Sequence, residues 1–164
     1  GDHRYQHSFP TRRSSDLSFD FEALEVAVRN QALHMASAVL ARWLNSDTSD
    51  YMGESTQCPH CGGTARYHGR RTRMVVTAVG AMELSRAYYY DPACHQGFFP
   101  RDQDLRFDQS SYSPHVVRSI GSVASVVSFQ ESSSLLEELS GLAIGAKQVE
   151  REIGRASCWE RVFM

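Results

Sequence analysis

The stretch TQCPHCGG, residues 56–63, constrains the fold of this chain more than any other feature, because only two residues separate Cys58 from Cys61. Two thiolates so spaced supply half of a tetrahedral zinc site. Pro59 and the Gly62–Gly63 pair favour a tight turn around the two sulfur atoms. The chain must then bring further ligands to the same point.

A β-hairpin is expected to connect this cysteine pair to the remaining ligands. Residues 73–79 (RMVVTAV) and residues 82–90 (MELSRAYYY) are two runs with strand character, and Gly80–Ala81 between them offers a tight turn with glycine first. Zinc ribbons place two ligand pairs at the ends of such a hairpin. Cys94, which follows the second run, is therefore the expected third ligand.

The fourth ligand is less clearly marked. Asp91 stands where a repeat of the first spacing would put a cysteine, and a carboxylate oxygen can ligate zinc. His95 is the second candidate, although neighbouring residues chelate one ion awkwardly, and His60 is a weaker one. The predicted structural zinc site consists of three thiolates and one further group, with the aspartate slightly preferred: Cys58, Cys61, Cys94, and Asp91 or His95.

The cysteines have other possible uses, which the sequence makes less favourable. A thioredoxin-like redox pair needs a βαβ context that the sequence lacks. Buried structural thiols without a metal remain an alternative. A catalytic zinc ion is disfavoured, because the sequence contains neither an HExxH motif nor the zinc deaminase pattern.

Composition gives weaker limits. The chain has 164 residues, four cysteines and a formal net charge of −2, so bulk charge indicates no particular partner. No apolar run is long enough to cross a membrane and no secretory signal is visible. A reduced, intracellular protein with a metal site is the interpretation that fits the low cysteine count.

Both ends of the chain look like translated adapter sequence. Residues 8–17 (SFPTRRSSDL) can be encoded by TCTTTCCCTACACGACGCTCTTCCGATCT, a string that resembles a common sequencing-library adapter. Its reverse complement encodes EIGRASCRER, and residues 152–161 read EIGRASCWER, with Trp159 as the single mismatch. We therefore expect the natural segment to span residues 18–151 and exclude Cys158 from the metal site.

Residues 20–45 predict one helix, with Asp20 as its N-cap and a polar linker, residues 45–50, after it. An apolar stripe recurs at spacings of three and four, as expected of a packing or dimerising helix. Its members are Phe21, Leu24, Val28, Ala32, Met35, Val39 and Trp43.

The C-terminal third predicts further helices. Ser113 and Pro114 fit the N-cap and first position of one helix, and Ser128 with Glu131 fits a capping box that begins the next. Gly141 ends that helix, and residues 145–151 begin a third. Helix, glycine turn and helix occur in the order of a helix-turn-helix.

Two groups of polar residues are candidate DNA contacts. Arginines cluster beside the first cysteine pair, together with His68 and Tyr67, and a second set lies where a recognition helix would begin. The predicted contacts are Arg66, Arg70, Arg71, Arg73, Lys147, Gln148 and Arg151. The alternatives are a solvated strand edge and an ordinary helical hairpin.

These elements together predict an α+β fold with an N-terminal helix, a zinc-ribbon-like β-hairpin and a helix-turn-helix-like region. The predicted segments are an adapter-derived tail (1–17), an amphipathic helix and linker (18–49), the zinc-ribbon-like hairpin (50–108), a truncated helical region (109–151) and a second adapter-derived tail (152–164).

The order of motifs resembles the N-terminal part of insertion-sequence transposases of the Kra type. The resemblance covers essentially residues 18–151 and rests on CPHCGG, YHGRRTR, SRAYYY, FFPRD and the helical region after Ser113–Pro114. It implies a zinc-ribbon-like and helix-turn-helix region that recognises the terminal repeats of the element. Cys58, Cys61 and Cys94 match the family's zinc ligands, whereas Asp91 stands where members often have cysteine.

The resemblance also implies a downstream RNase H-like domain whose three acidic residues bind two magnesium ions for DNA transposition. No residue of this sequence matches those acids, so no catalytic residue is expected here. The implied setting is the bacterial cytoplasm and nucleoid, with homo-oligomers possible in a full-length parent. A stand-alone zinc-ribbon interaction module without DNA binding is the alternative function.

Overall fold

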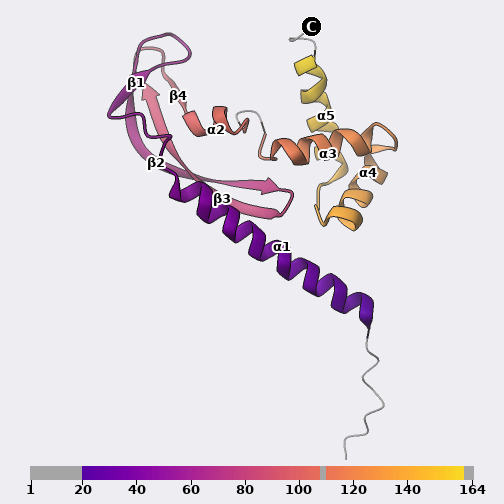
Figure 1. Cartoon of the computed structure of the whole chain (residues 1–164). Helices are drawn as coiled ribbons and strands as arrows, with labels where there is room; N and C mark the ends of the chain where they lie inside the picture. The colour runs from indigo at the N-terminus through magenta and orange to yellow at the C-terminus, as the bar shows by residue number, and fades with distance from the viewer. Residues whose placement is uncertain (1–19, 108–109, 161–164) are drawn as a thin grey trace, which may run out of the picture.

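The protein has the mixed helix-and-strand architecture that the sequence predicts (Figure 1). The computed structural model describes residues 20–107 and 110–160, with side chains as far as residue 155. The predicted tail 1–17 and the boundary between residues 108 and 109 lie outside the described residues. The elements in chain order are α1 (Phe21–Ser46), β1 (Ser55–Gln57), β2 (Thr64–Thr77), β3 (Gly80–Asp91), β4 (Gln96–Phe98), α2 (Pro100–Asp104), α3 (Pro114–Ala124), α4 (Phe129–Leu135), the π-helical turn η1 (Leu136–Ser140) and α5 (Ala146–Glu160).

The four strands form one antiparallel sheet in the order β1-β2-β3-β4, and the long β2–β3 hairpin is its centre. The predicted hairpin exists, but its turn lies two residues earlier than expected, at Ala78–Val79. The Thr77 hydroxyl donates to the Gly80 carbonyl (2.8 Å) and accepts from the Val79 amide (3.3 Å), which closes the loop there. Gly80 follows the turn at φ 123°, a conformation that glycine tolerates best.

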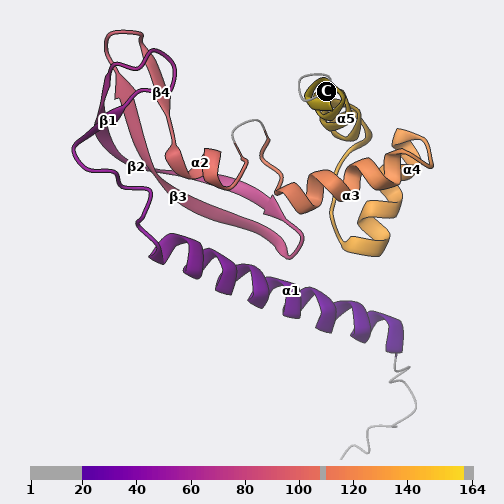
Figure 2. The ribbon, with the colours of Figure 1, turned by 45° about the horizontal axis from the view of Figure 1, so that its top comes forward.

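Strand β2 begins at Thr64, well before the predicted residue 73, because its first part pairs with both β1 and β3. The pairing of β2 with β3 shifts register between Tyr67 and Arg70, and Gly69 in this bulge has φ 88°. The turn end of the hairpin lies beside α1, whereas its other end, with β1 and β4, lies away from α1 (Figure 2).

Helix α1 begins as predicted, because the Asp20 carboxylate accepts a hydrogen bond from the Ala23 amide (3.1 Å). The apolar stripe predicted as a packing or dimerising face is not the face that packs on the sheet, and its dimerising role stays a prediction. Half-buried leucines, Leu40 and Leu44 among them, and the buried Ser37 lie on the side toward β3. Most of the predicted stripe is exposed on the other side: Phe21, Leu24, Val28, Met35, Val39 and Trp43.

The C-terminal helices follow the predicted capping signals. Ser113 accepts from the Val116 amide (3.4 Å), and Ser128 and Glu131 form a complete capping box. Gly141 ends η1 at φ 71°, where a left-handed conformation favours glycine. One apolar core joins α3, η1, the loop after η1 and α5; it is formed by Val116, Ile120, Leu136, Leu142, Ile144 and Val149.

Helix α5 continues through the point where the natural segment was expected to stop. Glu152, the first residue of the predicted C-terminal tail, is 2% exposed. Its carboxylate accepts hydrogen bonds from Ser110 (2.9 Å) and Arg155 (2.9 Å). The structure therefore has no break between Arg151 and Glu152, whatever the origin of the tail.

Candidate metal centre

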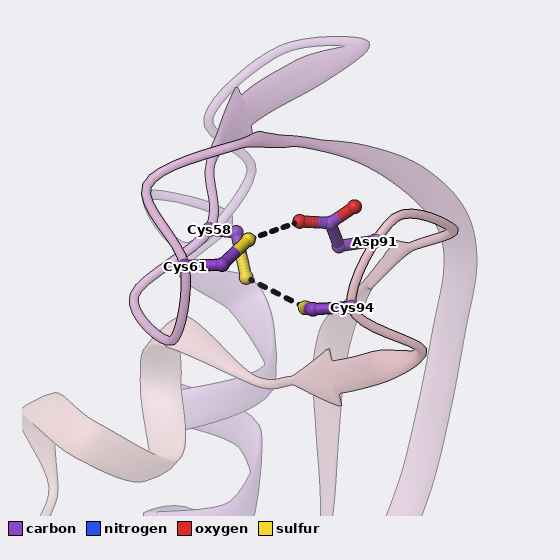
Figure 3. Close-up of side chains that lie close together, drawn as sticks. All are labelled: Cys58, Cys61, Asp91 and Cys94. Atoms are coloured by element: carbon purple, nitrogen blue, oxygen red, sulfur yellow. Dashed lines mark hydrogen bonds between the residues drawn. The ribbon is translucent and has the colours of Figure 1, made fainter.

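Four side chains meet at the end of the sheet remote from the β2–β3 turn (Figure 3). Cys58 and Cys61 come from the loop between β1 and β2, Asp91 ends β3, and Cys94 lies in the turn before β4. One ligand atom from each of the four lies within 4.8 Å of all the others. These are the three predicted thiols and the preferred fourth group.

Backbone hydrogen bonds shape the first cysteine loop. The Cys58 amide donates to the Gly63 carbonyl (2.8 Å), and the Gly62 amide donates to the Cys58 carbonyl (2.9 Å). Gly62 has φ 74°, which a residue with a Cβ atom rarely adopts. The turn therefore folds back on itself and directs both thiols toward β3.

Gly63 determines how closely this loop approaches Asp91. A Cβ atom at Gly63 would lie 3.1 Å from Asp91 Oδ2 and 3.2 Å from Cys61 Sγ. The Gly63 amide also donates to Cys61 Sγ (3.3 Å). Gly63 thus leaves room for the Asp91 carboxylate, in addition to the role in the turn that the sequence predicts for it.

Hydrogen bonds link the two halves of the site. The Cys61 thiol donates to Asp91 Oδ2 at 2.9 Å, and Cys58 Sγ lies 3.7 Å from Cys94 Sγ. The Ala93 amide donates to the other Asp91 oxygen at 2.8 Å. Asp91 is fully buried and Cys58 nearly so, whereas the Cys61 side is exposed. The open side gives an ion a route to the ligands.

The same contacts shift the acidities of these groups. The hydrogen bond from Cys61 lowers the pKa of Asp91 to about 2, and it raises the pKa of Cys61 to about 12. Burial raises the pKa of Cys94 above its ordinary value. The site therefore holds the Asp91 carboxylate beside protonated Cys61 and Cys94 thiols, which a metal ion must deprotonate to bind.

The donor set fits a divalent metal ion. A tetrahedral zinc ion with bonds of about 2.3 Å holds two thiolates roughly 3.8 Å apart, and Cys58 Sγ and Cys94 Sγ are 3.7 Å apart. Three sulfur donors and one oxygen donor match the ligand types that zinc takes in proteins. The four residues could hold such an ion with little movement of the chain.

The two histidine alternatives are not part of this group. His95 lies next to Cys94, but its Nδ1 is 3.2 Å from the Tyr90 hydroxyl and its ring is exposed. His60 is also exposed within the first loop. The backbone explains the outcome, because Asp91 ends β3 on the buried side, whereas His95 has a positive φ of 57° in the exposed turn.

Two of the predicted DNA contacts are held by partners within the protein. Arg70 forms an ion pair with the buried Asp50 (3.0 Å) and donates to the Ser85 carbonyl (2.9 Å). Arg73 reaches Asp102 (3.3 Å) and the Phe107 carbonyl (2.9 Å). Both guanidinium groups therefore connect β2 to other elements of the fold.

The remaining arginines of the cluster lie on an exposed part of the sheet. Arg66 is exposed and pairs with Tyr90 in register. The guanidinium carbon of Arg71 lies 3.7 Å above the ring of Tyr88. His68 makes edge contacts with both tyrosines, at centroid distances of 6.4 and 5.8 Å. We call these five residues the basic–aromatic face.

Tyr88 and Tyr90 of this face were not among the residues predicted from the sequence, which indicated Tyr67 instead. Tyr67 packs edge-on to Tyr51 and beside Tyr89, within the cluster of apolar residues under the sheet. The alternation of side chains along β3 could have indicated that Tyr88 and Tyr90 share the face opposite Tyr89. The bulge at Gly69, however, changes which β2 residues accompany them.

The predicted contacts of the C-terminal region lie on α5. Lys147 and Arg151 are exposed, and Gln148 is half-buried. The Arg151 guanidinium donates to Gln148 Oε1 (3.0 Å), and the Gln148 amide donates to Glu152 (2.9 Å). Gln148, Arg151 and Glu152 therefore form one hydrogen-bonded row along the helix.

Comparisons with protein-family models, with curated proteins and with solved structures found no match to this chain. Within the described residues, no helix combines the length and the apolar character that crossing a membrane requires.

Proposed function

We propose that this chain is a zinc-braced DNA-binding module, the end-recognising N-terminal region of an insertion-sequence transposase. The observation that carries the proposal is the basic–aromatic face, where Arg71 stacks on Tyr88 and Arg66 lies opposite Tyr90. Arginines bind phosphates, and aromatic rings beside them stack on bases or pack against sugars. Internal ion pairs occupy Arg70 and Arg73, which leaves Arg66, His68 and Arg71 to make the contacts.

The metal centre would support this face from one end. Asp91 directly follows Tyr90 on β3. Cys58 and Cys61 lie in the loop that leads into β2, where Arg66 pairs with Tyr90. Zinc would supply folding free energy here rather than catalysis, because four protein ligands leave no open position. The ion would hold the ends of β2 and β3 together and so fix the distance between Arg66 and the tyrosines.

Helix α5 offers a second set of contacts. Lys147 and Arg151 lie on its exposed side, and α5 shares an apolar core with α3 and η1, as a helix-turn-helix needs. In the proposal the sheet contributes phosphate contacts, and the start of α5 enters the major groove. Recognition of terminal repeats is the step that this chain would contribute to transposition.

The test uses the full chain loaded with zinc and a fluorescent duplex of arbitrary sequence, because phosphate contacts are independent of sequence. Binding should weaken as salt rises. Arg66→Ala and Arg71→Ala should each weaken binding and lower the slope of log affinity against log salt by about 1. Arg118→Ala, which removes an exposed arginine from α3, is the matched control.

The outcomes separate the two candidate functions. Zinc-loaded protein that binds no duplex would favour the interaction module without DNA binding. Equal losses from Arg71→Ala and Arg118→Ala would mean that only overall charge matters and would remove the basic–aromatic face from the proposal.

A further inference from the structure

The outer face of α1 is an unusually apolar surface for the outside of a small protein. Its side chains are 68% exposed at Phe21, 63% at Met35 and 72% at Trp43. We use "outer face" for the row formed by Phe21, Leu24, Val28, Ala32, Met35, Val39 and Trp43. Both views place α1 along one side of the molecule, with the hairpin and the other helices on its opposite side (Figures 1 and 2).

The spacing of this row is regular along the whole helix. The steps from Phe21 to Ala32 are three, four and four residues, and the same steps lead from Ala32 to Trp43. An 11-residue repeat contains about 3.67 residues per turn, close to the 3.6 of a straight helix. The row therefore runs nearly parallel to the helix axis, over a length of about 33 Å at 1.5 Å per residue.

The first half of α1 needs a covering partner. Residues 21–32 are all exposed, and Arg29 reaches another element by donating a hydrogen bond to the Leu139 carbonyl (3.0 Å). A helical segment of this length is marginal in water without packing. An apolar row on such a segment is best explained by an interface.

The row is complementary to itself when a second copy runs in the opposite direction. Phe21 then faces Trp43, Leu24 faces Val39 and Val28 faces Met35. Ala32 meets its own copy at the two-fold axis. Large residues pair at the ends and the smallest lies at the centre, where the two helices come closest.

Charge favours the same direction. The beginning of the helix carries Asp20, Glu22 and Glu25, and Arg42 lies near its end, where the C-cap Asp47 is already paired with Arg101 (3.4 Å). An antiparallel pair brings the acidic end of one copy to Arg42 of the other, whereas a parallel pair would bring like charges together.

The exposed part of the row amounts to roughly 600 Å² per copy if a large side chain buries 150–250 Å², so two copies reach the ~1,000 Å² of a specific interface.

We propose that the outer face of α1 is a dimer interface, on which a second copy of this chain lies antiparallel. The inference does not depend on DNA binding. Sedimentation of the zinc-loaded full chain at about 10 µM should give the mass of a dimer, since that concentration detects a micromolar dissociation constant. A monomer under these conditions overturns the proposal.

Two variants test the face itself. Val28→Glu combined with Met35→Glu places unpaired carboxylates in the row and should convert the dimer to monomer. His34→Glu introduces the same side chain at an exposed position outside the row and should leave the dimer intact. A dimer that survives the double change, with unchanged zinc content, overturns the proposal.

Arg42 tests the direction without altering the apolar row. Arg42→Glu should weaken the dimer several-fold at low salt, because glutamate then meets the partner's acidic end. Adding Glu22→Lys and Glu25→Lys should restore association. In a parallel pair Arg42 lies beside its own copy, so an unchanged or tighter dimer of Arg42→Glu would overturn the antiparallel arrangement.

Discussion

The thiol of Cys61 and the carboxylate of Asp91 lie 30 residues apart in sequence and 2.9 Å apart in space. This contact joins the loop before β2 to the end of β3 and completes the candidate metal centre. It explains why an aspartate can take the fourth position, because the fold buries the carboxylate beside three thiols and directs one oxygen toward them.

Asp91 is the first target for a test of the metal centre. Asp91→Asn should lower zinc affinity strongly, because a neutral amide is a poor zinc ligand. Loss of a residue that only hydrogen-bonds to a ligand costs roughly tenfold to hundredfold in affinity, and we expect a larger loss here. Asp91→Cys should raise the affinity by completing four thiolates. Competition with a chromophoric chelator measures both. His95→Ala is the control, and a large loss from it would return His95 to the ligand set.

Zinc affinity should rise with pH. The thiols of Cys61 and Cys94 have raised pKa values, so both still carry protons near neutral pH and must lose them to bind the ion. Affinity should therefore increase by about a factor of ten per pH unit for each proton released. Chelator competition between neutral pH and pH 9 checks this, and a flat profile would speak against thiolate ligation.

The metal-free protein should lose stability at both extremes of pH. The pKa of Asp91 is lowered to about 2 in the fold, so its contribution is present above the ordinary value of 3.8 and is lost as pH falls toward 2. The pKa of Cys61 is raised from 9.0 to about 12, so its contribution is present below pH 9 and is lost as pH rises toward 12. Urea unfolding against pH measures this, and Asp91→Asn should flatten both limbs.

Gly63→Ala should reduce zinc affinity although it removes no ligand. The new Cβ atom would lie 3.1 Å from Asp91 Oδ2 and 3.2 Å from Cys61 Sγ, which forces the two sides of the site apart. Gly145→Ala is the matched control, because a Cβ atom there meets nothing within 4 Å. Equal zinc affinities for the two variants would show that the loop can move without cost.

Arg101→Ala should strongly destabilise the fold. The Arg101 side chain is 4% exposed and connects the end of α1 to Asp50, with Nη2 donating to the Asp47 carbonyl (2.6 Å) and to Asp50 (3.3 Å). Loss of one member of a buried ion pair costs about 3–5 kcal/mol of unfolding free energy. Chemical denaturation measures the change, and Arg71→Ala, on the exposed face, should shift the same curve little.

The sequence alone predicted what depends on short-range chemistry. Asp20, Ser113 and the Ser128–Glu131 pair cap helices where expected, because a capping side chain bonds to amides within the next turn. The α+β class followed from two strand-like runs between helical patterns. The spacing of Cys58 and Cys61 predicted half of the candidate metal site, since one tight turn brings both sulfurs together.

Tertiary structure decided what depends on distant contacts. Helix α1 has apolar residues on two sides, and only packing on β3 selected the side of Leu40 and Leu44 and left the predicted row exposed. Arg70 and Arg71 are neighbours with the same charge, yet Arg70 meets the buried Asp50 and Arg71 stacks on the half-buried Tyr88. The choice between Asp91 and His95 likewise depended on which one β3 carries to the thiols. Local periodicity cannot determine these pairings, because each partner lies in another element of the chain.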